Sequence, residues 1–136
     1  MSIEKYRSRL SGPILDRVDI FMQVPRVKTG ELGEKRSGLT SIVLKEKVMK
    51  AKEMQHMRFV GKKIHSNAEM SNVEIEKLAN IGPEAIKIAI SSTEKLKLST
   101  RVYYRILRVA RTIADIDNSE IVEIKHILEA FSYRGN

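Results

Sequence analysis

The chain of 136 residues is 42% hydrophobic and 31% charged, which is typical of a globular protein with one modest core and too short for two ordinary domains. It contains no cysteine, which excludes disulfides, thiolate catalysis and cysteine metal sites, and no apolar run approaches the roughly 20 residues that cross a bilayer. The net charge of +8 lies mostly in residues 1–70 and suits a polyanionic partner, nucleotide or nucleic acid, as well as a plain basic surface. We expect a cytoplasmic protein without a membrane partner.

The first 38 residues predict an extended segment followed by a linker. Residues 3–10 have the length for one or two helical turns, which a Gly-Pro pair then ends. Residues 18–24 (VDIFMQV) alternate roughly between apolar and polar side chains and predict a strand that Pro25 ends. Residues 25–38 are rich in glycine and charge without periodicity, as in a flexible linker. We therefore place the domain boundary between residues 38 and 39.

Beyond residue 38 the pattern is helical, with short loops between helices. Helices are expected over residues 39–58, over 71–80 behind a Ser-x-x-Glu capping box, from Pro83, from Thr100 to about Ile116, and over 123–133. The side chains expected to face the core are Leu44, Val48 and Ala51 in the first helix and Ile124, Ile127, Leu128 and Phe131 in the last. Short loops between helices predict an all-α fold, a small antiparallel bundle.

The most distinctive expected helix lies within residues 98–115 (LSTRVYYRILRVARTIAD). Spacings of four, three and three residues place four arginines on one face: Arg101, Arg105, Arg108 and Arg111. Its opposite side carries the apolar residues Val102, Ile106, Val109, Ala110 and Ile113. Ser99 is placed to cap the helix, which puts Arg101 in the first turn, where an anion such as phosphate is favoured. The alternative is a solvated arginine face.

A second motif, residues 11–19 (SGPILDRVD), surrounds one arginine with acids. Gly-Pro and Ile-Leu precede Arg17, which Asp16 and Asp19 flank. Taken alone, this pattern leaves open a local ion pair between Arg17 and either aspartate.

Together these motifs resemble a known family. The pattern SGPxLDRxD, followed by LSxRxYxRILRVARTIAD and finally by EAxxYR, is similar to the C-terminal part of magnesium-chelatase-related AAA+ ATPases, most of all their bacterial competence-protein (ComM-like) subgroup. Smaller matches are Ala51 and Gln55, the NAxM motif at residues 67–70, and Glu129-Ala130 with Tyr133-Arg134. The resemblance covers about residues 5–134.

The resemblance implies that residues 1–38 are the end of an AAA+ core with its linker, and that residues 39–136 are the helical lid domain. Arg17 matches the arginine finger, which acts in trans on the neighbouring subunit's ATP. Arg101 matches the sensor-2 arginine, which contacts the γ-phosphate in its own subunit. Arg105 and Arg108 are further nucleotide-binding candidates; for these two, as for Arg111, a surface or packing role is the alternative.

For the full-length protein the resemblance implies an ATPase with ATP and Mg²⁺ as cofactors and neighbouring subunits of a homo-oligomeric ring as partners. The work performed would be DNA remodelling, with DNA as a partner. A subunit fragment of a magnesium-chelatase-type ATPase is an alternative. A second alternative, from a different class, is a stand-alone basic helical module that binds nucleic acid, although the arginine helix lacks the Asn and Gln side chains that read bases.

An ATPase also needs a glycine-rich phosphate loop and a strand-terminal acid for magnesium, and this sequence has neither (no Walker A, no Walker B). The pair Gly61-Lys62 has His56 in place of the first glycine of that loop and Lys63 in place of its Ser/Thr. We expect the chain alone to bind no cofactor and to hydrolyse no ATP.

Three further features complete the reading of the sequence. The histidines, at positions 56, 65 and 126, lack metal-ligand spacing, so we expect no metal site. Lys97 stands where the family commonly has glycine, so the preceding helix is expected to close differently. Glu123 replaces a Ser/Thr cap, so the last helix is expected to be capped less well.

Overall fold

The computed structural model describes residues 17–26 and 38–134. Its elements are the α-helices α3 (Ser41–Arg58), α4 (Asn72–Leu78), α5 (Pro83–Lys95), α6 (Thr100–Ile116) and α7 (Ile124–Ser132), with a short 3₁₀ turn, η2 (Asn67–Glu69). The predicted all-α fold is confirmed, and the helix boundaries lie within two residues of those expected. In the described ranges no helix is long and apolar enough to cross a membrane.

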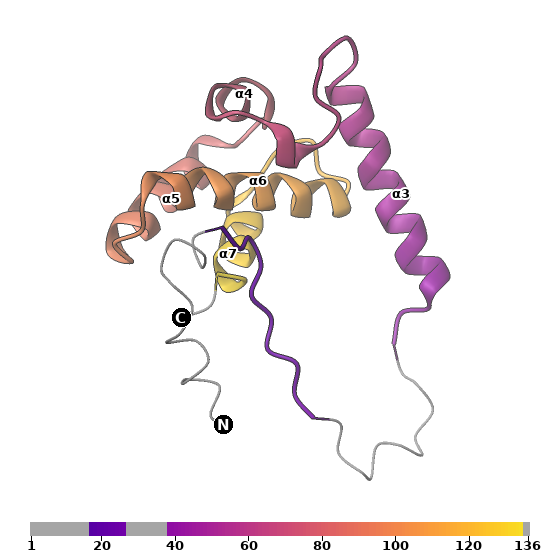
Figure 1. The fold of residues 1–136 in the computed structure, drawn as a ribbon, viewed down its shortest axis with the longest axis horizontal. Helices are drawn as coiled ribbons and strands as arrows, with labels where there is room; N and C mark the ends of the chain where they lie inside the picture. The colour runs from indigo at the N-terminus through magenta and orange to yellow at the C-terminus, as the bar shows by residue number, and fades with distance from the viewer. Residues whose placement is uncertain (1–16, 27–37, 135–136) are drawn as a thin grey trace.

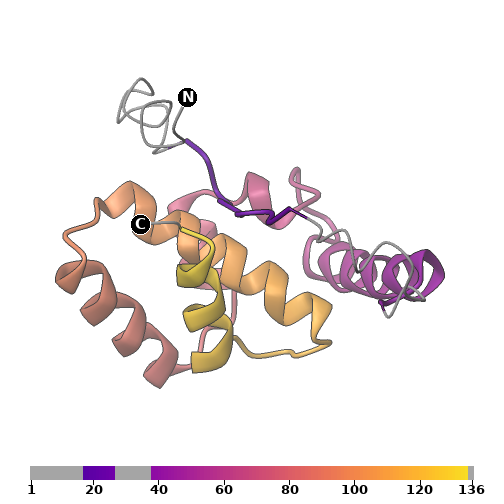
Figure 2. The same cartoon turned by 90° about the horizontal axis from the view of Figure 1, so that it is seen from below.

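Helix α6 lies at the centre of the bundle and contacts every other element (Figure 1). Helix α7 crosses it on one side, α4 and η2 cover another, and α5 lies near the end of α6 that bears the first turn (Figures 1 and 2). The buried apolar side chains of α6 are Val102, Ile106, Leu107, Ala110, Ile113 and Ala114. The expected core face of this helix is therefore confirmed, except that Val109 is only partly buried.

The outer helices bury less than their patterns predicted. In α3 only Ala51 is buried, whereas Leu44 and Val48 are about half exposed, because all of residues 41–50 lie away from the other helices (Figure 1). In α7 Ile127 is buried and Phe131 partly buried, but Ile124 and Leu128 are exposed. The predictions for these four exposed side chains were wrong, because a helix packed at one end or on a narrow stripe covers only that part of its apolar surface.

Residues 17–26 contain neither helix nor strand, so the strand predicted over residues 18–24 is not formed. A strand needs a neighbouring backbone to pair with along its length. Within residues 17–26 the backbone contact to another element is a single bond, from the amide of Phe21 to the carbonyl of Tyr133 (2.6 Å). The segment lies along the bundle beside α6 and α7 (Figures 1 and 2). The expected helical turns at residues 3–10, and all but the ends of the expected linker at 25–38, lie outside the described residues.

A buried ion cluster fastens α6 to the loops around it. Asp115 and Arg111, one turn apart on α6, are both fully buried and paired, with Arg111 Nη2 2.9 Å from Asp115 Oδ1. The remaining Arg111 donors bond the carbonyls of Ala79, Ser119 and Glu120, in the loops before α5 and before α7. Burial lowers the pKa of Arg111, and the charge of Asp115 opposes this fall.

The same carboxylate holds α3 and η2. Arg58, the last residue of α3, donates to both oxygens of Asp115 (2.9 and 2.5 Å) and to Asn67 Oδ1 (2.8 Å). The side-chain amide of Asn67 in turn donates to Asp115 Oδ2 (2.8 Å), and its backbone N–H donates to Gln55 Oε1 (3.0 Å). Asn67 of the NAxM motif and Gln55 thus belong to the hydrogen-bond network around Asp115.

We predict that Asp115→Asn lowers the free energy of unfolding by about 3 kcal/mol or more, because it leaves two buried guanidiniums without their counter-charge. The matched control is Glu84→Gln, whose carboxylate is 67% exposed and pairs with an exposed lysine, so that its loss should cost less than about 0.5 kcal/mol. Urea denaturation followed by circular dichroism measures both. Equal stability losses in the two variants would contradict the role assigned to the cluster.

Helix α5 closes at Lys97 in the left-handed conformation, with φ of 51°. The amide of Lys97 donates to the carbonyl of Glu94, and that of Leu98 to Thr93 (both 3.0 Å), which is the Schellman arrangement that glycine favours at this position. The expectation that the helix closes differently without glycine was therefore wrong. The lysine adopts the glycine conformation, at a cost from contact between Cβ and the backbone.

We predict that Lys97→Gly raises the free energy of unfolding by about 0.5–1 kcal/mol, since glycine removes that contact. The control is Lys95→Gly in the last turn of the same helix, which should lower it by about 0.5–1 kcal/mol because α-helical backbone disfavours glycine. Thermal unfolding of both variants tests the assignment, and a loss of stability in both would refute it.

Candidate functional site

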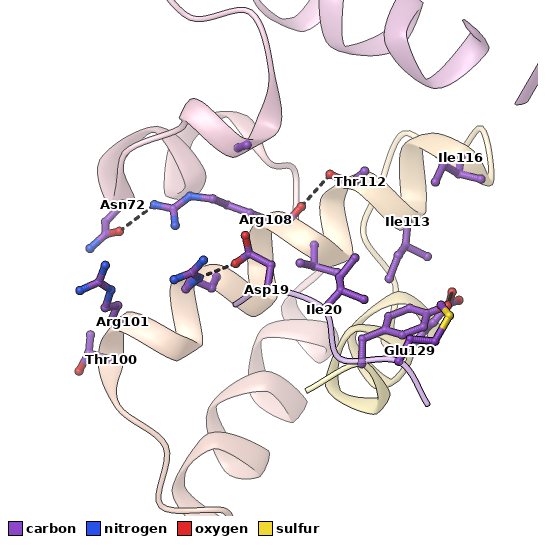
Figure 3. Close-up of a pocket in the computed structure, with 15 residues that line it drawn as sticks. Asp19, Ile20, Asn72, Thr100, Arg101, Arg108, Thr112, Ile113, Ile116 and Glu129 are labelled. Carbon is purple, nitrogen blue, oxygen red and sulfur yellow. Dashed lines mark hydrogen bonds and ion pairs between the residues drawn. The ribbon is translucent and has the colours of Figure 1, made fainter. Parts of the chain in front are cut away.

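A cleft of about 950 Å³ lies between α6, the start of α4, the end of α7 and residues 17–26 (Figure 3). Its basic lining comes from three of the four arginines on α6: Arg101, Arg105 and Arg108. Its apolar lining comes largely from the second half of α6, at Val109, Ile113 and Ile116, and from Ile20 and Met22. The candidate site residues from the sequence were these three and Arg17. The three line one wall of the cleft, and the backbone carbonyl of Arg17 is bonded to one of them, Arg105.

Arg101 lies in the first turn of α6, where the sequence placed it. Ser99 caps the helix as predicted, since its Oγ accepts from the amide of Val102 (3.4 Å). The side chain of Arg101 is exposed at the end of the cleft near Asn72 (Figure 3), and it has no hydrogen-bond or ion-pair partner in the described parts of the chain. A guanidinium in this position combines its own charge with the positive end of the helix.

Arg108 spans the cleft to α4. Its Nε donates to the carbonyl of Met70 (2.8 Å), and its Nη2 lies 3.4 Å from Asn72 Oδ1 (Figure 3). Partial burial lowers the pKa of Arg108, whereas the charge of Asp19 raises it and that of Arg105 lowers it further. Arg108 therefore has a packing role that fixes the start of α4 against α6.

Arg105 binds residues 17–26. It forms an ion pair with Asp19, and its Nη2 donates to the carbonyl of Arg17. Asp19 is thus occupied by Arg105 rather than by Arg17, and the other aspartate of the motif, Asp16, lies outside the described residues. The Arg17 side chain is exposed, while its backbone is held by α6.

Residues after α7 bind the same segment. Arg134 Nη1 donates to the carbonyl of Val18 (2.8 Å), and its guanidinium lies 5.8 Å from the centre of the Phe21 ring. The Phe21 amide donates to Tyr133, whose hydroxyl donates to Glu129 (2.9 Å), a bond that raises the pKa of Tyr133. The EAxxYR motif therefore closes the cleft by binding backbone.

The four arginines of α6 pass from exposed to buried along the helix. At about 100° per residue, the ten residues from Arg101 to Arg111 leave the two side chains about 80° apart around the axis. Arg101 consequently faces solvent, Arg105 and Arg108 bind neighbouring segments, and Arg111 enters the core. Arg111 therefore has the packing role that the sequence left open for it, since its side chain is fully buried and paired with Asp115.

Sequence reasoning missed Arg58, Asp115 and Arg134 as partners of these residues. A signal existed for Asp115, because its spacing of four from Arg111 is that of a helical ion pair. Arg58 lies 57 residues from Asp115, and Arg134 lies 116 from Val18, so no local pattern joins them.

The three histidines lie in different parts of the bundle: His56 in α3, His65 in the loop that follows α3, and His126 in α7. The described residues include no group of three His, Cys, Asp or Glu side chains able to hold a metal. His126 is fully buried, and its Nδ1 accepts from the amide of Glu123 (2.9 Å), which is the residue before α7. The N–H of Glu123 thus donates to a histidine in the first turn, which is a different bond from the one that a Ser/Thr side chain at position 123 would accept from the helix amides.

The comparisons with known proteins fall on these same segments. The family model described as magnesium chelatase, subunit ChlI C-terminal, matches residues 38–134, and that described as magnesium chelatase, subunit ChlI, matches residues 1–32. The chain is 39% identical over 136 residues to competence protein ComM of Haemophilus influenzae, covering 98% of this chain and 26% of that protein. It is 38% identical over 132 residues to the uncharacterized protein YifB of Escherichia coli K12, covering 96% and 25%.

An uncharacterized protein of Mycobacterium tuberculosis H37Rv is 30% identical over 130 residues. The chain spans about a quarter of the length of these relatives. The two matched regions together contain the cleft, the arginine helix and the C-terminal motif. The chain belongs to the magnesium chelatase ChlI family.

Proposed function

We propose that this chain is the lid portion of an AAA+ ATPase, in which Arg101 acts as the sensor-2 residue on the ATP of its own subunit and Arg17 as the arginine finger in the neighbouring subunit. The observation that carries the proposal is the position of Arg101, exposed in the first turn of α6 at the mouth of a cleft. The membership of the ChlI family and the resemblance to a competence protein support it.

The residues of the cleft fit the triphosphate part of ATP. Arg101 has an exposed, permanently charged fork able to bind two phosphate oxygens, and it lies next to helix amides that also favour an anion. Arg105 and Arg108 add positive charge nearby, although their donors are already bonded to protein groups. The described residues hold no carboxylate cluster for Mg²⁺, so we propose that the metal is bound with ATP by another part of the protein.

The role proposed for Arg17 follows from how it is held. Its backbone is bonded to α6 and its side chain is exposed, so the guanidinium is displayed rather than packed. A displayed arginine suits transition-state stabilisation in trans, because the charge that it meets develops on a phosphoryl group bound by another subunit.

DNA is the partner that we propose for the full-length protein. The exposed first half of α3 carries several lysines, namely Lys45, Lys47 and Lys50, with Lys52 just beyond, and residues 41–70 carry a charge of +4. A titration of the chain with labelled DNA at two salt concentrations tests direct contact. Binding should weaken as salt rises, through reduced counterion release; binding without salt dependence, or none at low salt, would count against this part of the proposal.

In the full-length ATPase we predict that Arg17→Ala lowers kcat by about a thousandfold or more while leaving the Kd for ATP unchanged, because a finger acts on the transition state. Arg101→Ala should also raise the Kd for ATP, because a sensor contacts the ground state. Steady-state turnover and fluorescent-nucleotide binding measure the two effects. Arg26→Ala, an exposed arginine on the same segment as Arg17, is the control and should change neither.

A further inference from the structure

We infer that Arg105 and Arg134 are positioning residues. They bind residues 17–26, the finger segment, to the helical lid, so that Arg17 moves together with α6, the helix that carries Arg101. This inference rests on the proposed function, and it adds residues and a coupling that the proposal does not contain. The coupling would link the lid of one subunit to the ATP of the next, through the arginine finger.

The two arginines bind consecutive carbonyls. Arg105, on α6, donates to the carbonyl of Arg17, and Arg134, which follows α7, donates to the carbonyl of Val18 (2.8 Å). Arg105 is anchored a second time by its ion pair with Asp19. Because both peptide units that follow the Arg17 α-carbon are bonded, the direction in which its side chain leaves the backbone is set by the lid.

Polar contacts, rather than burial, hold the segment in place. Phe21 is the only partly buried side chain of residues 17–26, while Ile20 and Met22 remain 51% and 71% exposed. The segment therefore buries little apolar surface against the bundle, and this burial contributes little to its docking. The bonds from Arg105 and Arg134 to backbone, together with the pair to Asp19, are charge-assisted and individually stronger.

Arg101 and Arg105 lie four residues apart on α6, so they are neighbours on one rigid helix. A shift of α6 that brings Arg101 onto a phosphate therefore also moves the carbonyl of Arg17, through Arg105. The structure thus offers a direct mechanical link between occupancy of one subunit's site and the finger presented to its neighbour's site.

The test uses mixed rings of the full-length ATPase, which separate the two roles of each subunit. The recipient subunit carries Arg17→Ala and has an intact ATP site. The donor subunit has an ATP site that binds ATP but does not hydrolyse it, and it has an intact Arg17. Turnover then arises only where a donor finger reaches a recipient site, and the recipient keeps both Arg105 and Arg134.

Placing Arg105→Ala and Arg134→Ala together in the donor should lower turnover at least tenfold, with the KM for ATP unchanged because every active site has an unmodified lid. A donor with Arg26→Ala is the matched control and should support the same turnover as the unmodified donor. Asp19→Ala in the donor removes the ion pair from an exposed residue that packing does not require, and should give a smaller loss in the same direction.

Amide exchange of Phe21 gives a second readout on the 136-residue chain, independent of activity. Exchange should accelerate in the Arg105→Ala, Arg134→Ala variant, while amides in the middle of α6 stay slow and show that the bundle is folded. Unchanged protection of Phe21, or full turnover with the doubly substituted donor, would overturn the coupling alone. No turnover with the unmodified donor, in rings shown to contain both subunits, would instead overturn the finger role of Arg17 and the coupling with it.

Discussion

The shared carboxylate of Asp115 is the interaction on which the rest of the bundle depends. It lies fully buried near the end of α6 and faces two guanidiniums, one from its own helix and one from the end of α3. A single buried charge between two opposite charges is costly to desolvate, and it is tolerated because every oxygen accepts several donors. Through Arg111 the same cluster binds the loops that lead into α5 and α7. The helices around α6 are thus held by polar contacts at one end and by apolar side chains along its length.

This arrangement explains why one helix serves both structure and site. The end of α6 that carries Arg111 and Asp115 is fixed in the core, and the opposite end displays Arg101. Arg105 and Arg108 lie between them and bind the two segments that form the walls of the cleft. The rotation of about 100° per residue converts a run of similar residues into side chains with different environments. The buried Arg111 thus fixes the helix that displays Arg101 at the cleft, about three turns away.

Local signals were sufficient for much of the fold. The Ser99 cap, the capping box at Ser71 and the proline at the start of α5 set helix boundaries that depend only on neighbouring residues. The structure differs where the outcome depends on distant partners. Residues 18–24 have a strand pattern but no strand beside them, and Leu44 lies on a helix whose first half meets no other element. Secondary-structure propensity depends on the residues of one segment, whereas strand pairing and side-chain burial also require a second segment to lie beside it.

The candidate site was predictable in part for the same reason. The positions of Arg101 and Arg17 followed from motifs, but the link between them, through Arg105 and Arg134, joins residues 88 and 116 apart in sequence. The backbone conformation of Lys97 could not be predicted for another reason. Lysine does not favour the left-handed conformation, which is imposed here by the hydrogen bonds that close α5.

The bond between Val18 and Arg134 has a consequence for the order of events during synthesis. Its two ends are separated by 116 residues, so at roughly 5–20 residues per second the ribosome needs about 6–23 s after residue 18 to add the partner of its carbonyl. Arg105 on α6 can bind the carbonyl of Arg17 before the end of that interval, whereas the carbonyl of Val18 must wait for Arg134, which follows α7. Residues 17–26 are therefore fully docked last, and a nascent chain cannot hold them in their final position before the helical bundle has formed.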